Sequence, residues 1–196
     1  MSVDLEDYYC DLPFSEWSTF EPRIEQNTRI ILDLFDKYDI KSTFFTLGYI
    51  GEQFPELVKE ISEKGHEIAS HSYAHLDLRK SSKENVEEDL KKSIDILQKV
   101  TGKKIKGFRA PFFSLDKNSF WAMKIIEKYF KYDSSIFPTK TPLYGNPNAP
   151  RFQYKPSVEN PIRKDHNSKI IEIPLATLKF PLIRNIPIAG GFYLRF

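Results

Sequence analysis

Two histidines four residues apart carry the clearest chemical meaning in this sequence. His71 and His75 account for half of the four histidines among 196 residues. A neutral imidazole is the commonest metal ligand, and two at this spacing can reach one ion from a helical turn or a tight loop. The alternative is a pair of surface histidines that meet by chance. We favour the metal site.

Three carboxylates near the N-terminus form a second candidate. Asp4, Glu6 and Asp7 occupy three of four consecutive positions. Such carboxylates repel one another unless a cation or an arginine lies nearby. Taken alone, the cluster is better explained as an acidic loop. From Val3 onward the residues alternate between apolar and acidic, as at the end of a buried strand that opens into a loop.

The elements that must position these residues alternate between strands and helices. Apolar residues recur at helical spacing in four segments, about 21–38, 55–64, 81–102 and 119–129. Short segments rich in β-formers lie between them, at about 41–50, 67–70, 106–108, 131–132 and 170–175. Residues 3–5 read as a further short strand. This order favours a parallel sheet or a βα barrel in an α/β fold.

The helix over 81–102 has its own start and stop signals. Ser81, with Glu84 three residues later, resembles a capping box, and Gly102 follows the last apolar position. We expect its charged face to be solvated surface.

Polar residues stand at the ends of the predicted strands. In a βα barrel the carboxyl ends of the strands meet on one face and build the active site. The polar residues that this arrangement would bring together are Asp4 to Asp7, His71 with His75, Arg109 and Asp133. Two histidines and one carboxylate leave coordination positions open, as a catalytic metal requires. Arg109 would keep a second carboxylate ionised as a base; its other reading, a structural ion pair with Asp133, is compatible with that role.

Composition and charge exclude several classes of protein. The formal net charge of +2, with lysines dispersed among glutamates, argues against nucleic-acid binding. No apolar run approaches the roughly 20 residues that a membrane span needs. The N-terminus lacks the features of a signal peptide, so we expect a cytoplasmic protein. The lone Cys10 excludes an internal disulfide and is expected to be buried.

The length is suited to one domain. We expect a single domain over residues 1–196, with an irregular proline-rich segment at about 138–168. Loops of this length inside compact domains often cover functional sites.

The ordered motifs resemble those of the polysaccharide deacetylases, the NodB-homology or carbohydrate esterase family 4 group. The resemblance spans nearly the whole chain, and the later segments resemble the branch found in exopolysaccharide gene clusters. The motifs that carry it are Asp4 to Asp7, His71-Ser72-Tyr73-Ala74-His75, Arg109-Ala110-Pro111-Phe112-Phe113-Ser114, Tyr132-Asp133-Ser134-Ser135, Tyr144 to Phe152, and Ala189-Gly190-Gly191-Phe192-Tyr193.

The resemblance implies a distorted (β/α) barrel of about seven parallel strands that removes acetyl groups from N-acetylated glycans. A divalent metal, usually zinc, would serve as cofactor. Asp4 would be the general base, oriented by Arg109, with Asp133 bracing the arginine. His71 and His75 would be metal ligands together with Asp7, and Glu6 is the rival for that third place.

The remaining implied residues form the substrate side of the site. Pro111 and Phe112 would bind substrate, and the backbone N–H of Phe112 would help to hold the oxyanion.

The family also places a catalytic-acid histidine in a final strand, and this sequence reaches Phe196 without one. We therefore expect a truncated chain whose last strand or strands are missing. The alternative to an active deacetylase is then a catalytically impaired glycan-binding remnant.

Two further expectations concern partners and rival chemistry. An open barrel edge at the missing strand could pair with another chain and form an oligomer. A two-histidine, one-carboxylate iron oxygenase has similar ligands. However, that site usually lies on a β-sandwich, which the βα order here disfavours.

Overall fold

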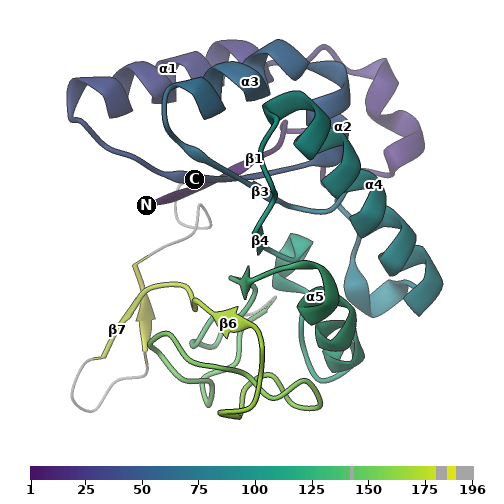
Figure 1. Cartoon of the computed structure of the whole chain (residues 1–196), viewed down its shortest axis with the longest axis vertical. Coiled ribbons are helices and arrows are strands. Elements are labelled where there is room, and N and C mark those ends of the chain that lie inside the picture. Colours follow the sequence, from purple (N-terminus) through teal and green to yellow (C-terminus); the bar gives the residue numbers. More distant parts are fainter. Residues whose placement is uncertain (142–143, 180–184, 189–196) are drawn as a thin grey trace. The chain divides into compact units, whose positions relative to one another are not determined.

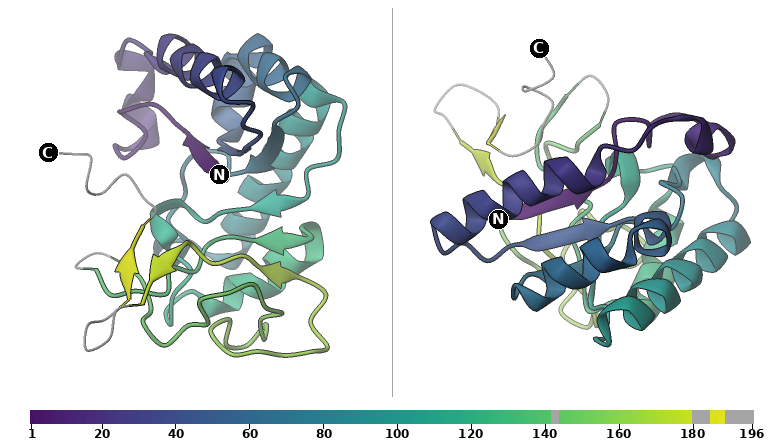
Figure 2. Two further views of the ribbon diagram at one scale, coloured as in Figure 1. Left: turned by 90° about the vertical axis from the view of Figure 1, so that its left-hand side faces the viewer. Right: turned by 90° about the horizontal axis from the view of Figure 1, so that it is seen from above.

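The computed structural model describes residues 1–141, 144–179 and 185–188. They group into two compact units, Met1–Leu76 with Ser81–Arg109, and Asp77–Lys80 with Ala110–Phe196. Figure 1 labels most of the helices and strands, and Figure 2 shows them from two further sides. The single domain expected over residues 1–196 stays a prediction, and the Ala189–Tyr193 motif lies outside the described residues.

The first unit is built on parallel strands. Neighbouring strands pair in chain order, so that β1 contacts β2, β2 contacts β3 and β3 contacts β4. In this register Asp4 lies opposite Phe45, and Ser70 lies opposite Phe108. The predicted parallel α/β class is confirmed. The four strands are β1 (Ser2–Leu5), β2 (Thr43–Thr46), β3 (Glu67–Ser70) and β4 (Gly107–Phe108).

Helices at about 21–38, 55–64 and 81–102 lie where the apolar spacing predicts them, whereas those at Phe14–Thr19 and Gly48–Gln53 were not foreseen. The helices of this unit are η1 (Phe14–Thr19), α1 (Ile24–Lys37), α2 (Gly48–Gln53), α3 (Pro55–Glu63) and α4 (Lys83–Thr101). Two details differ from the sequence reading. The strand expected in the segment 41–50, with Gly48 closing it, ends at Thr46, and a short helix begins at Gly48. The N-cap of α4 is Ser82 rather than Ser81, and its side chain accepts the backbone N–H of Asn85.

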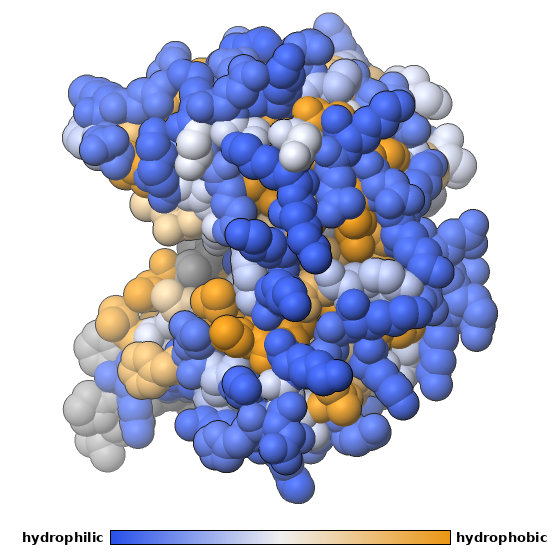
Figure 3. Space-filling view, viewed as in Figure 1, coloured by the Kyte–Doolittle hydropathy of each residue, from blue (hydrophilic) through white to orange (hydrophobic). Residues whose placement is uncertain are grey.

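The helices of this unit pack their apolar sides inward. Both α3 and α4 contact β3, and Figure 1 shows α1 and α3 on the same side of β1 and β3. Phe44, Leu57 and Leu90 are fully buried, and the contacts of α3 and α4 hold β3 in place. On the face drawn in Figure 3, hydrophilic residues cover most of the outer surface over α1 and α3.

The second unit has shorter elements. Its β5 and β6 pair in parallel, and β7 and β8 form an antiparallel pair that the sequence reading did not foresee. The irregular segment near 138–168 contains only isolated bridges among its described residues, such as that between Pro156 and Lys164. Its elements are η2 (Leu78–Lys80), η3 (Pro111–Phe113), η4 (Phe120–Ala122), α5 (Met123–Tyr129), β5 (Tyr132–Asp133), β6 (Ile171–Glu172), β7 (Thr177–Leu178) and β8 (Ile186–Pro187).

Within the described part of the chain, no helix has both the length and the apolar character needed to cross a membrane.

Candidate metal centre

The end of β1 supplies two acidic side chains to one side of the strand. Asp4 is in β1 and Glu6 directly follows it. Side chains two residues apart along extended backbone point to the same side. The chain therefore presents the carboxylates of Asp4 and Glu6 together, while Leu5 between them is buried in the core.

The loop after β3 supplies two imidazoles. His71 and His75 are both buried, and the chain between them makes a tight turn. Ser72 and His75 have φ angles of 67° and 53°, in the left-handed region that side chains other than glycine rarely adopt. This unusual backbone aims both rings at the end of β1.

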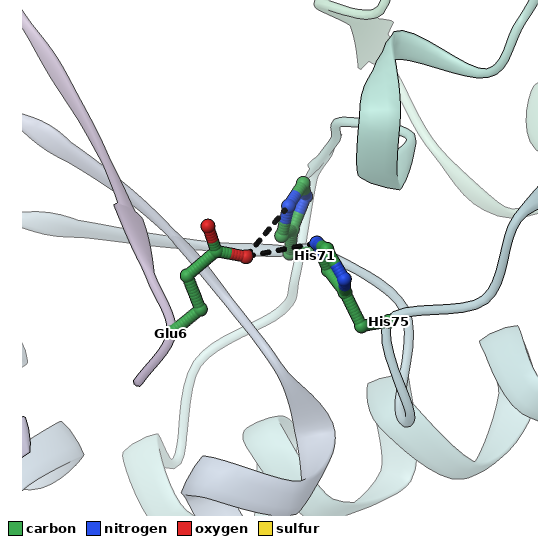
Figure 4. Close-up of side chains that lie close together, drawn as sticks. All are labelled: Glu6, His71 and His75. Atoms are coloured by element: carbon green, nitrogen blue, oxygen red, sulfur yellow. Dashed lines mark ion pairs between the residues drawn. The ribbon is translucent and has the colours of Figure 1, made fainter. Parts of the chain in front are cut away.

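Glu6 and the two histidines form one cluster. Figure 4 shows their side chains pointing toward one another. Oε2 of Glu6 lies 2.8 Å from Nε2 of His75 and 3.7 Å from Nε2 of His71. One possible ligand atom from each residue lies within 4.8 Å of the other two, and among the described residues this is the one group of three or more such side chains.

The protonation state of His71 is set by its neighbour. Nδ1 of His71 lies 2.7 Å from the backbone carbonyl oxygen of Arg109. Because a carbonyl can only accept a hydrogen bond, Nδ1 must carry the proton and Nε2 must present its lone pair to the cluster. Burial lowers the pKa of His71 and thereby favours this neutral form. Metal-ligating histidines commonly have this arrangement.

His75 has acidic neighbours on both sides of its ring. Burial acts to lower the pKa of His75, but the contact with Glu6 outweighs it, so the pKa is raised. Nδ1 of the same ring lies 3.7 Å from Oδ1 of Asp11. In the absence of a cation, the raised pKa favours protonation of His75 beside Glu6. A divalent cation would replace that proton.

The donor set fits a divalent metal. Two imidazoles and one carboxylate, with most of their surface buried, are typical ligands of a catalytic zinc ion. Ligand atoms around tetrahedral zinc are separated from each other by roughly 3–3.5 Å, since each lies about 2.0–2.2 Å from the metal. The separations of 2.8 and 3.7 Å are close to that spacing. Three protein ligands leave a position open for water or substrate.

Asp4 and Arg109 form a partly buried ion pair in the same unit. Nη1 of Arg109 donates to Oδ1 of Asp4 at 2.6 Å, and Nη2 donates to Oγ of Ser2 at 3.2 Å. Burial raises the pKa of Asp4, but the Arg109 guanidinium and the neighbouring histidines outweigh it, so the net shift is downward. Asp4 is therefore ionised near neutral pH. Arg109 thus orients Asp4 through its side chain and His71 through its carbonyl oxygen.

The sequence reading assigned the third ligand place to Asp7, and the structure favours its rival, Glu6. The Asp7 carboxylate accepts the backbone N–H groups of Arg23 and Ile24 at 2.7 and 3.0 Å and that of Tyr8 at 2.8 Å. The Arg23 and Ile24 donors lie at the start of α1, where the first N–H groups of a helix need acceptors. Asp7 thus stabilises the helix start and is not among the clustered side chains.

Three other predicted site residues belong to the second unit. Asp133 is fully buried, and its Oδ1 accepts the Ser135 hydroxyl at 2.6 Å. Pro111 and Phe112 lie in η3, where Phe112 has a φ of 56°. The bracing role of Asp133 and the substrate-binding roles of Pro111 and Phe112 stay predictions.

One residue near the site was missed by the sequence reading. Asp89 lies on the face of α4 that was expected to be solvated, yet its carboxylate accepts the backbone N–H groups of Tyr73 and Ala74. Its signal is weak, since α4 carries many other acidic residues. Only the position of the histidine loop in the folded protein distinguishes Asp89 from the other acidic residues of α4.

Two family models match the sequence. The model described as polysaccharide deacetylase matches residues 13–128. A second, described as a domain of unknown function (DUF3473), matches residues 134–196.

Individual proteins match parts of the chain. A peptidoglycan-N-acetylglucosamine deacetylase of Bacillus cereus is 36% identical over 93 residues, which cover 47% of this chain and 34% of that protein. A peptidoglycan deacetylase of Helicobacter pylori is 32% identical over 115 residues, covering 58% of this chain and 39% of that protein. The chain thus spans less than half the length of these curated relatives.

A solved structure shares the fold. The crystal structure of a Mycobacterium smegmatis protein described as a polysaccharide deacetylase aligns with a TM-score of 0.58 and 23% identity. The alignment covers 82% of this chain and 50% of that one. This likeness agrees with the predicted fold class.

Proposed function

The chain belongs to the polysaccharide deacetylase family, and from that premise we propose that it is a metal-dependent deacetylase of N-acetylated glycans. The observation that carries the proposal is the site in the first unit. Glu6, His71 and His75 form a cluster that could hold a metal ion. The Asp4–Arg109 ion pair lies beside it, because Asp4 is two residues before Glu6 and the Arg109 carbonyl oxygen contacts His71.

A divalent cation, for which zinc is our candidate, would polarise the acetamide carbonyl and lower the pKa of an attacking water. We assign Glu6, His71 and His75 to hold it. The imidazoles would bind through Nε2, because Nδ1 of His71 is already engaged with the Arg109 carbonyl. This assignment places Glu6 where the sequence reading had placed Asp7.

Asp4 is the candidate general base. Its carboxylate points to the same side of the chain as that of Glu6, and Arg109 keeps it ionised and in a fixed orientation. An ionised carboxylate that is held at one oxygen can accept a proton from water at the other. The reaction consumes this water and the N-acetyl group and yields acetate and a free amine on the sugar.

N-acetylated glycans are the proposed substrate class. Two matching relatives are named as peptidoglycan deacetylases, one of them specific in its name for N-acetylglucosamine.

Acetate release provides the direct test. The zinc-loaded protein should release acetate from N-acetylglucosamine oligomers or from peptidoglycan, and chelation should abolish the release. Asp4→Asn should lower the rate by about 10²–10⁴-fold, the usual contribution of general acid–base catalysis, while zinc stays bound. His75→Ala should lose both zinc and activity.

The outcomes separate the proposal from its alternative. Zinc and glycan binding without acetate release would favour a glycan-binding protein that lacks turnover. Acetate release that does not depend on Glu6, His71 or His75 would contradict the assigned site.

A further inference from the structure

The loop between the two histidines is held in a conformation that its own sequence does not favour. Both Ser72 and His75 have positive φ angles, although neither is a glycine. Such residues persist only where surrounding contacts determine the backbone. If the loop relaxed toward ordinary angles, His71 and His75 would no longer face the same point.

Neighbouring helices supply the contacts that hold this loop. On one side the start of α2 donates to the loop, with N–H groups of Gly48 and Tyr49 bonded to the carbonyls of Ser72 and Tyr73 at 2.8 and 3.1 Å. On the other side, α4 accepts from the loop through the side chain of Asp89.

The Asp89 contact is bidentate. Oδ1 accepts the N–H of Tyr73 at 2.8 Å, and Oδ2 accepts the N–H of Ala74 at 3.1 Å. These are the second and third of the three residues between the two histidines. A carboxylate is the side chain that can accept two successive backbone N–H groups with separate oxygens. Charge-assisted hydrogen bonds of this kind are stronger than those between neutral groups.

Asp89 is itself held in place by a long and well-packed helix. Its neighbours on α4, Val86, Leu90 and Ser93, are buried, and Oγ of Ser93 lies 2.8 Å from Oγ of Ser70 at the end of β3. Asp89 therefore connects the loop to an element that is fixed relative to β3.

We propose that Asp89 is a positioning residue of the metal site, whose carboxylate fixes the loop between His71 and His75 so that both imidazoles face Glu6. The inference rests on the metal-binding role proposed for the two histidines. Asp89 contacts neither the cation nor the substrate; it acts through the loop backbone. Partners of this kind behind metal ligands typically affect metal affinity by about 10–100-fold.

The chain offers a matched control on the same helix. Asp95 is exposed on α4, so Asp95→Ala removes the same charge without touching the loop. We would compare Asp89→Ala, Asp89→Asn and Asp95→Ala in the full chain. An asparagine keeps one acceptor oxygen and replaces the other with a donor, so it should retain part of the contact.

Two readouts separate positioning from general stability. The first is the zinc dissociation constant, measured by competition with a chelator. We expect it to rise about 10–100-fold in Asp89→Ala, to rise less in Asp89→Asn, and to stay unchanged in Asp95→Ala. The second is hydrogen exchange of the Tyr73 and Ala74 amides in the metal-free protein. In Asp89→Ala, the exchange of these two amides should accelerate more than the exchange of the amides in β2 and β3.

Each outcome decides the question. Unchanged zinc affinity and unchanged exchange of the two amides in Asp89→Ala would overturn the inference, as would an equal effect of Asp95→Ala. If Asp89→Ala does not fold, Asp89→Asn is judged by the same two measurements. If zinc affinity depends on Asp89 but the protein releases no acetate, the proposed activity is rejected and the inference about Asp89 stands. Failure of the wild type to bind zinc would reject the metal site, while amide exchange would still report on the loop.

Discussion

Adjacent carboxylates at the end of β1 have different partners. The side chain of Glu6 reaches the two histidines, whereas that of Asp7 accepts three backbone N–H groups near the start of α1. Neighbouring residues on extended backbone point to opposite sides, so only one of the two can face the histidines. Their substitution should therefore separate metal binding from stability.

We predict that Glu6→Gln mainly lowers zinc affinity, whereas Asp7→Ala mainly lowers the stability of the fold. Glu6→Gln should weaken zinc binding by at least about 100-fold, since a direct ligand should matter more than the partners behind it, with little loss of stability. Asp7→Ala should lower the free energy of unfolding by roughly 2 kcal/mol, as the loss of a strong helix cap does, and leave zinc affinity nearly unchanged. Chelator competition and urea unfolding measure the two quantities. A large loss of zinc affinity in Asp7→Ala alone would restore Asp7 as the ligand.

The sequence alone identified most residues of this centre but not their detailed geometry. His71, His75, Asp4 and Arg109 follow from residue type and from their positions at strand ends, and the structure brings them into one unit. The choice between Glu6 and Asp7 depends on which side of the chain each carboxylate takes just after β1 ends at Leu5. A shift of one residue exchanges the two, and propensity and periodicity do not place a strand end that accurately.

At the scale of elements, the site depends on how closely α2 approaches α4. A Cβ placed on Gly48 would lie 2.9 Å from both Cα of Ser93 and Cδ2 of Tyr73. The sequence reading took Gly48 as the end of a strand, because a glycine after a β-rich segment usually marks a turn. Its actual role, to let two helices meet beside the histidine loop, depends on tertiary packing that local sequence does not encode.

We predict that Gly48→Ala disturbs both stability and the metal site. The added methyl group must displace α4 backbone or the Tyr73 ring, which typically costs about 1–3 kcal/mol. Since Gly48 also donates to the Ser72 carbonyl, zinc affinity should fall as well. Gly102→Ala is the control, because its φ of 65° makes alanine unfavourable by about 1 kcal/mol, while no atom lies within 4 Å of the new Cβ. Equal zinc affinity in the two variants would argue against a link between α2 and the loop.

The half-buried position of Asp89 should also appear in the pH dependence of stability. Burial raises the pKa of Asp89 from 3.8 to about 6. Between these values the folded protein binds the proton more tightly than the unfolded chain, so this group's contribution to stability is greatest below 3.8 and is lost as pH rises to about 6. The melting temperature of the metal-free wild type, measured relative to that of Asp89→Asn, should therefore decline across this range. A constant difference between the two proteins would contradict the raised pKa.

At the scale of the molecule, the proposed metal ligands and the candidate base all belong to the first unit. The boundaries of the units and of the family models differ. The polysaccharide deacetylase model extends to residue 128 and so includes most of α5, whereas the first compact unit ends at Arg109. Composition and periodicity indicated one domain, since the alternation of strands and helices continues across this boundary. Compactness is a property of contacts in three dimensions, and it is visible only in the folded chain.

The two tryptophans offer a way to assign the metal to one unit. Trp17 lies in the first unit and Trp121 in the second, and the chain has no other tryptophan. With 5-fluorotryptophan in place of both, each unit gives its own ¹⁹F NMR signal. Zinc at about 100 times its dissociation constant stabilises the state that binds it by about 2.7 kcal/mol. We predict that zinc raises the free energy of unfolding reported by Trp17 by this full amount. The free energy of unfolding reported by Trp121 should rise by no more than this. A shift confined to Trp121 would place the metal in the second unit and contradict the assignment of Glu6, His71 and His75.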